Sequence, residues 1–320
     1  MVSNYMKYFP QVIALLALTI VCGYILYNET KMSVEETLAS KAFYPKNTDL
    51  PPTEFQEYRN AVSLQLPDTL SFAGEAVPLN LPDVQERLDR ELHINTYWHS
   101  STIFLLKRAN KWLPQMEIIL KKNGIPEDFK YLAAIEGAFM NQVSPANAVG
   151  FWQIRKDAGK ENGLEISRDV DERYDPIKST EAACSYLNKA YKKFGNWTNV
   201  AASYNRGMSG LGRALDNQKV DSYYDLMLND ETSRYVFRVL AIKEIFQNPK
   251  KYGFDINANH LYESEKLRYV TIDADIKDLV QFAQDQGINY KLLKRHNPWL
   301  RDDNLNVRRG KTYQIAIPEI

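Results

Sequence analysis

The sequence predicts a mainly α-helical domain of α+β type, followed by a small β-α-α-β unit. Over residues 84–120, apolar side chains recur at the three- and four-residue spacing of amphipathic helices. Pro126 and Asp175-Pro176 mark the starts of further helices. Near the C-terminus, residues 268–275 and 311–318 alternate between apolar and polar side chains, as strands do.

The chain begins with an apolar segment. Residues 12–27 carry no charge, and with Phe9 the segment approaches the roughly 20 residues that span a bilayer. Lys7 precedes it, which favours retention of the N-terminus on the inner side. We predict that residues 1–28 are an uncleaved membrane anchor, with residues 9–27 in the membrane and the rest exported. A cleaved signal segment, which would leave the protein secreted, is the alternative.

Residues 29–81 contain prolines at positions 45, 51, 52, 67 and 78 and show weak periodicity, which predicts a tether. The helical pattern dominates from there on, and we assign residues 82–255 to one domain. Within it, residues 141–173 are rich in Ser, Asn, Gly and Asp. A loop of that length inside a compact domain is often functional.

The pattern of residues 265–320 predicts a second domain. Apolar and polar side chains alternate in RYVTIDAD (268–275), as in a strand, and DIKDLVQFAQDQG (275–287) is typical of an amphipathic helix that ends at a glycine. NYKLLKRHNPWL (289–300) predicts another helix, and KTYQIAIP (311–318) a final strand.

Composition excludes several classes of function. The chain has 40 acidic and 40 basic residues, so it lacks the basic excess of a nucleic-acid-binding protein. Cys22 lies in the apolar segment, which leaves Cys184 without a disulfide or zinc partner in the exported part. The four histidines lack metal-ligand spacing. We therefore expect no metal and no cofactor.

One carboxylate stands in a segment that otherwise predicts burial. On the helix that starts at Pro126, Glu136 shares an apolar stripe with Phe129, Leu132 and Phe139. Burial disfavours ionisation, so a carboxyl group in this setting can stay protonated near neutrality and act as a general acid. The alternative is that Glu136 lies at the edge of the stripe or pairs with an arginine.

Two later stretches supply polar groups that suit a carbohydrate. GFWQI (150–154) presents the amide of Gln153, which both donates and accepts hydrogen bonds. AASYNRG (201–207) ends a helix with the phenol of Tyr204 and the amide of Asn205 before a turn at Gly207.

The order and spacing of these motifs resemble the lytic transglycosylase family, which has a lysozyme-like catalytic domain, and most closely its membrane-bound type D. The family pattern is a Glu-Ser at a helix end, a Ser-x-Ala-x-Ala-x-Gly-Leu-Trp-Gln loop, a Tyr-Asp-Pro and an Ala-Tyr-Asn-x-Gly. The matching stretches here are Glu136-Gly137, SPANAVGFWQ (144–153), Tyr174-Asp175-Pro176 and SYNRG (203–207). The resemblance covers residues 82 to 250. Residues 265–320 resemble a divergent LysM glycan-binding module, although a structural cap on the catalytic domain is the competing interpretation.

The resemblance implies that the chain cleaves the β-1,4 bond between MurNAc and GlcNAc in peptidoglycan, on the periplasmic side of the inner membrane. Glu136 would be the single acid/base and would yield 1,6-anhydro-MurNAc ends without water. The resemblance also implies substrate-binding roles for Gln153, Tyr204, Asn205, Ser144 and Arg206. Its partners would be glycan strands and, through the N-terminal segment, the membrane.

Two alternatives remain at this stage. A hydrolytic, lysozyme-like muramidase would activate water with a second carboxylate, and Asp157, Glu161, Asp169 and Asp171 lie in the loop after Glu136. A catalytically inactive peptidoglycan-binding protein could keep the same fold. Gly137 favours the second alternative, because it stands where the family has a serine hydroxyl.

Overall fold

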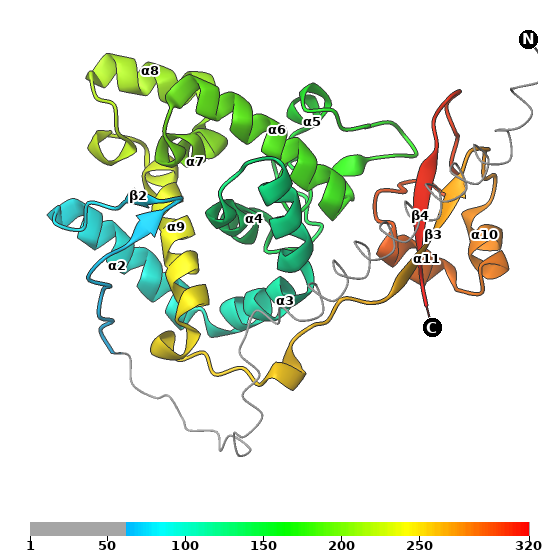
Figure 1. The fold of residues 1–320 in the computed structure, drawn as a ribbon, viewed down its shortest axis with the longest axis horizontal. Coiled ribbons are helices and arrows are strands. Elements are labelled where there is room, and N and C mark those ends of the chain that lie inside the picture. The colour runs from blue at the N-terminus through cyan, green and yellow to red at the C-terminus, as the bar shows by residue number, and fades with distance from the viewer. Residues whose placement is uncertain (1–61, 320) are drawn as a thin grey trace, which may run out of the picture. The chain divides into compact units, whose positions relative to one another are not determined.

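The computed structural model describes residues 62–319, in which helices dominate and strands are short (Figure 1). The predicted anchor at residues 1–28 and the tether up to residue 61 lie outside the described residues. Within residues 62–319, no helix is long and apolar enough to cross a membrane. The α-helices are α2 Pro82–Tyr97, α3 His99–Lys122, α4 Lys130–Gly137, α5 Lys156–Glu161, α6 Pro176–Phe194, α7 Trp197–Arg206, α8 Met208–Gln218, α9 Asp230–Gln247, α10 Leu279–Asp285 and α11 Tyr290–His296.

Short 3-10 turns and strands complete the described chain. The turns are η1 Glu127–Phe129, η2 Glu172–Tyr174, η3 Tyr223–Asp225, η4 Pro249–Tyr252 and η5 Ala258–His260. The strands are β1 Ser71–Phe72, β2 Glu75–Ala76, β3 Leu267–Ile272 and β4 Tyr313–Pro318, in two antiparallel pairs. The mainly α domain with a small two-stranded C-terminal unit matches the fold class predicted from the sequence.

The short helix α4 lies at the centre of the helical unit (Figure 1). It packs against α3 and α9, and α9 in turn packs against α2 and α7. The packed faces are apolar: Leu88 of α2, Leu113 of α3 and Leu240 of α9 have no exposed surface. Burial of such side chains contributes roughly 1.5–3 kcal/mol each, which is enough to hold a helix of only two turns.

The hairpin β1–β2 belongs to the helical unit, although the sequence assigned residues 29–81 to a tether. Phe72 is fully buried, and its ring lies 5.1 Å from that of Phe129. Glu75 accepts hydrogen bonds from the backbone N–H groups of Trp197, at 2.6 Å, and Thr198, at 2.9 Å. The helical unit therefore begins before residue 82, because this hairpin fills part of its core and satisfies the first turn of α7.

Helix α6 starts after Asp175, as the sequence predicts, whereas Pro126 precedes the 3-10 turn η1 and α4 starts only at Lys130. Asp175 accepts hydrogen bonds from the N–H groups of Ile177 and Lys178 at the start of α6. Asn196 does the same for the N–H of Asn199 in α7. Such caps satisfy N–H groups that have no partner within the helix. α7 ends at Gly207, whose φ of +77° suits glycine and turns the chain into α8.

The C-terminal unit pairs β3 with β4, from Leu267 opposite Pro318 to Ile272 opposite Tyr313. Its two helices are shorter than the sequence patterns suggest. Asp278 caps the start of α10, three residues into the predicted pattern, and α11 starts after its cap Asn289 but already ends at His296. Val170, from the loop between α5 and η2, is buried in the core of this unit.

Candidate active site

Glu136 lies in the last turn of α4, and an unusual turn follows it. Ala138 and Phe139 have φ values of +47° and +54°, in the left-handed region that residues other than glycine rarely adopt. Such backbone strain persists only where the surroundings impose it, and it is common near functional groups. Here Phe139 is buried, and the Ala138 carbonyl accepts a hydrogen bond from Arg108 Nε at 2.7 Å.

The carboxylate has one hydrogen-bond donor among the described side chains. Tyr235 Oη, on α9, donates to Glu136 Oε1 at 2.5 Å. Burial raises the pKa of Glu136, the Tyr235 hydrogen bond and the charge of Arg238 oppose this rise, and the negative charge of Glu231 adds to it. Since the net direction is upward, the protonated form persists to higher pH than in an exposed glutamate.

The structure does not pair Glu136 with an arginine. Arg238 Nη2 donates to the Ile135 carbonyl at 3.2 Å. Among residues 62–319, no cation lies within ion-pair distance of the Glu136 carboxylate. The positive charge therefore moderates the pKa of Glu136 without fixing its ionised form.

Gly137 is enforced by a close approach of the loop backbone. A Cβ atom at this position would lie 2.5 Å from the Gly150 carbonyl oxygen and 2.7 Å from both Cα and O of Phe151. These distances are too short for any side chain. The backbone of the loop thus occupies the space that a side chain at position 137 would need.

The loop places Gln153 and Trp152 close to Gly137. Gln153 has a φ of +46°, and its Nε2 donates to the Gly150 carbonyl at 2.9 Å and to the Gln142 carbonyl at 3.2 Å. Trp152 is fully buried, and its ring N–H donates to Thr180 Oγ1 at 2.9 Å. Trp152 therefore packs in the core, whereas the partly buried Gln153 has its amide oxygen free for another donor.

Tyr204 joins the loop to α7. Its hydroxyl donates to the Trp152 carbonyl at 2.8 Å, and its ring packs against that of Tyr186. Burial and the nearby charge of Glu136 both hold the pKa of Tyr204 well above its ordinary value. Tyr204 is therefore a neutral phenol in the electrostatic field of Glu136.

Asn205 is held by the first turn of α9. Its Nδ2 donates to Glu231 Oε1 at 3.0 Å, and its Oδ1 accepts from Thr232 Oγ1 at 2.9 Å. The first of these bonds links Asn205 to the carboxylate whose charge raises the pKa of Glu136.

The other two predicted substrate residues have different surroundings. Ser144 Oγ accepts from the Ala148 N–H at 3.0 Å, which closes a turn of the loop. Arg206 is exposed, and its guanidinium reaches the Gly210 carbonyl and Asn229 Oδ1, each at 3.4 Å. Among the described residues, Glu136, Gln153, Tyr204 and Asn205 make no hydrogen bond to one another. Tyr204 binds the carbonyl of Trp152, which directly precedes Gln153, and its pKa responds to the charge of Glu136. Ser144 supports the loop, and Arg206 directly follows Asn205.

The acidic residues of the loop lie in other interactions. Asp171 pairs with Arg173 at 2.7 Å, and Asp169 accepts hydrogen bonds from Asn306. Asp157 and Glu161 are exposed on α5. The carboxylate whose charge raises the pKa of Glu136 is instead Glu231, which the sequence did not predict as a site residue.

Tyr235 was also missed. It is the second of twelve buried positions on α9, so its surroundings in the sequence are typical of a core helix. The available signal was its hydroxyl, because a buried tyrosine normally has a hydrogen-bond partner. Within residues 62–319, no group of three His, Cys, Asp or Glu side chains could hold a metal ion.

Comparison with known proteins identifies two domains. Residues 116–227 match the transglycosylase SLT domain, and residues 268–320 match the soluble lytic transglycosylase C-terminal LysM-like domain. Over 261 residues the chain is 29% identical to membrane-bound lytic murein transglycosylase D of Escherichia coli strain K12, and equally to that of E. coli O6:H1. The alignment covers 79% of this chain and 56% of each relative, so the chain spans about half the length of the curated relatives it matches.

Proposed function

We propose that this chain, with its SLT domain followed by a LysM-like domain, is a lytic transglycosylase that cleaves the MurNAc–GlcNAc bond of peptidoglycan and leaves 1,6-anhydro-MurNAc ends. The observation that carries the proposal is Glu136, a carboxyl group in the last turn of α4, within the SLT domain, whose pKa is raised by burial and whose oxygen accepts a hydrogen bond from Tyr235. A group of this kind can give a proton near neutrality and take one back later in the same reaction.

In the proposed reaction, the protonated Glu136 gives its proton to the glycosidic oxygen as the bond to C1 of MurNAc breaks. The 6-hydroxyl of the same sugar then attacks C1, and the ionised Glu136 accepts its proton. The product is a cyclic ether, no water is consumed, and the carboxyl group regains its starting state. One carboxylate therefore suffices, in contrast to ordinary glycoside hydrolysis.

Tyr235 supports both halves of this cycle. Its hydroxyl donates to Glu136 and so stabilises the carboxylate that remains after the first proton transfer. Gln153, Tyr204 and Asn205 are the proposed substrate contacts, because each presents hydrogen-bonding atoms on elements fixed by other bonds. Arg206 and Ser144 complete the proposed set, Ser144 through the shape of its loop. The anchor at residues 9–27 and a glycan contact by the C-terminal unit also belong to the proposal.

The decisive experiment is mass spectrometry of the products that the purified protein releases from peptidoglycan sacculi. We expect 1,6-anhydro-muropeptides from the wild type and none from Glu136→Gln, which keeps an acceptor for Tyr235 but has no proton to give. Sacculus binding by both proteins without any product would support a catalytically inactive binding protein and would overturn the proposal.

Hydrolysis is the second candidate, and Glu231 is the observation that favours it. The negative charge of Glu231 raises the pKa of Glu136. Such an effect is expected between the two catalytic carboxylates of an ordinary glycoside hydrolase, which flank the same bond. Hydrolysis would give reducing-end products, heavier by one water, and Glu231→Gln would abolish them. In the proposed transglycosylase, Glu231→Gln keeps an acceptor for Asn205, so we expect it to retain most of the activity.

A further inference from the structure

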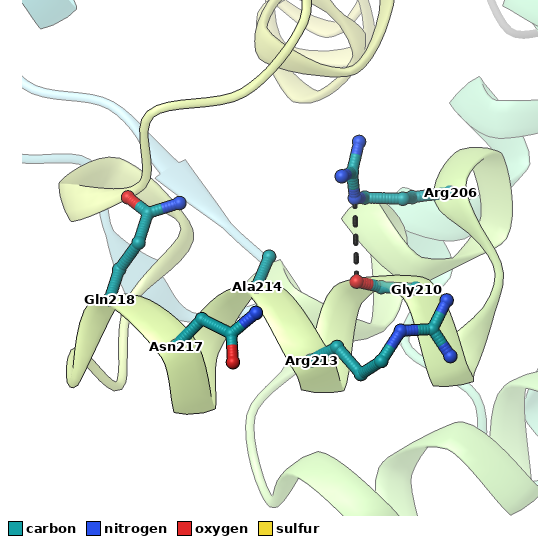
Figure 2. Close-up of a pocket in the computed structure, with 6 residues that line it drawn as sticks. All are labelled: Arg206, Gly210, Arg213, Ala214, Asn217 and Gln218. Carbon is teal, nitrogen blue, oxygen red and sulfur yellow. Dashed lines mark hydrogen bonds between the residues drawn. The ribbon is translucent and has the colours of Figure 1, made fainter.

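A pocket with two arginines lies where the end of α7 meets α8 (Figure 2). Its volume is about 440 Å³. Arg206 comes from the last residue of α7, and the other lining residues lie on α8: Gly210, Arg213, Ala214, Asn217 and Gln218. Glu136, Gln153 and Tyr204 are not among the residues that line this pocket.

The charge of the pocket is uncompensated. No acidic side chain is among its lining residues. Arg213 is exposed and makes no hydrogen bond or ion pair within residues 62–319. Arg206 uses two of its nitrogens in contacts of 3.4 Å with neutral oxygens, so most of its five N–H donors stay available. Two guanidinium groups without a carboxylate are suited to an anionic ligand, above all to a planar carboxylate.

The rest of the lining is suited to a peptide. Asn217 presents an amide group, which can both donate to and accept from a peptide backbone. The Gln218 side chain already closes the turn to Met227, with bonds to its carbonyl and its N–H, and this fixes its position. A volume of about 440 Å³ is in the range of small-molecule sites, far larger than one carboxylate fills.

We propose that this pocket binds the peptide stem of the peptidoglycan strand, with a stem carboxylate between Arg206 and Arg213. This inference rests on the proposed function, since it takes the glycan strand to lie along Glu136 and Asn205. Arg206 directly follows Asn205, and its partner Asn229 lies two residues before Glu231, so the pocket borders the glycan contacts. The enzyme would then distinguish strands that carry peptides from strands that have lost them.

The test compares peptide-bearing glycan strands with strands from which an amidase has removed the stems. For Arg213→Gln, we expect a KM on peptide-bearing strands that is roughly 1.5- to fivefold higher, the effect of one solvent-accessible ion pair. On stripped strands its KM should equal that of the wild type. Lys192→Gln is the matched control: Lys192 is an exposed cation of α6 without a partner in residues 62–319, and its loss should change neither value.

An equal loss on both substrates would overturn the inference, because stripped strands keep only the lactyl carboxylate. An equal effect of Lys192→Gln would also overturn it, in favour of general charge attraction. Failure of the proposed function gives a different pattern, namely no product from either substrate with the wild type. In that case the dissociation constant of the free stem tetrapeptide, measured by calorimetry, still decides: Arg213→Gln should weaken binding, and unchanged binding would refute the pocket.

Discussion

Replacement of Gly137 by serine tests the interpretation of the loop most directly. The sequence alone suggests that Gly137→Ser would restore a missing hydroxyl and raise activity. The structure predicts the opposite, because the new Cβ would lie 2.5–2.7 Å from three backbone atoms of Gly150 and Phe151. Backbone cannot rotate away as a side chain can, so the loop must move. Overpacking of this kind costs about 1–3 kcal/mol of unfolding free energy.

The assay is thermal unfolding of purified variants, together with the rate of product release from sacculi. A loss of 1–3 kcal/mol corresponds to a fall in Tm of roughly 2–4 °C per kcal/mol for a unit of this size. Gly137→Ala should be as destabilised as Gly137→Ser, since the clash comes from Cβ and not from the hydroxyl. Both variants should also lose activity, because Gln153 donates to the same Gly150 carbonyl that must shift.

Gly212→Ala is the control. Gly212 lies inside α8, and a Cβ there would meet only the flexible end of Lys193, at 3.0 Å from Nζ. Removal of a glycine from a helix interior stabilises it by up to about 1 kcal/mol, so Tm should not fall. If Gly137→Ser unfolds at the wild-type temperature and releases product faster, the close approach of the loop is wrong and the missing-hydroxyl interpretation is right.

Three further predictions concern the contacts around the site. Tyr235→Phe removes the hydrogen bond that opposes the rise in the pKa of Glu136, so the alkaline limb of the pH–activity profile should move to higher pH; an unmoved or lowered limb would contradict this. Because the folded-state pKa of Glu136 lies above its ordinary value of 4.5, its ionisation opposes folding. The unfolding free energy of the wild type, relative to that of Glu136→Gln, should therefore be greatest below pH 4.5 and should decline as pH rises through the folded-state pKa of Glu136. Denaturant titrations of both proteins at a series of pH values measure this difference, and a difference that does not change with pH would contradict the prediction. Glu75→Ala should lower the unfolding free energy by about 1–3 kcal/mol, through the lost bonds to Trp197 and Thr198, and equal chemical denaturation midpoints would refute the role of the hairpin.

The sequence predicts well what depends on local rules. The helix that carries Glu136 follows from Pro126 and the apolar stripe, and α6 follows from Asp175-Pro176. The strands of the C-terminal unit also follow, within a few residues, from their alternation. In each case the signal lies in neighbouring residues, where capping and side-chain periodicity act.

The parts that sequence reasoning missed depend on contacts between distant segments. Gly137 has an ordinary helical environment in the sequence, and only the approach of Gly150 and Phe151 explains it. Tyr235 is hidden in the apolar stripe of α9, 99 positions from its partner Glu136. The hairpin at residues 71–76 is too short for strand periodicity, and its place is set by Phe72 in the core.

The contacts of Glu75 and Tyr235 also limit how far the recognised domain can be exchanged as a module. Both residues lie outside the matched range 116–227, one on each side of it. A segment transplanted at those limits into another protein would bring Glu136 without the hydroxyl that donates to it, and α7 without the carboxylate at its first turn. The inherited unit of this catalytic fold is therefore longer than the stretch by which its family is recognised, and recombination that respects it must cut before the hairpin and after α9.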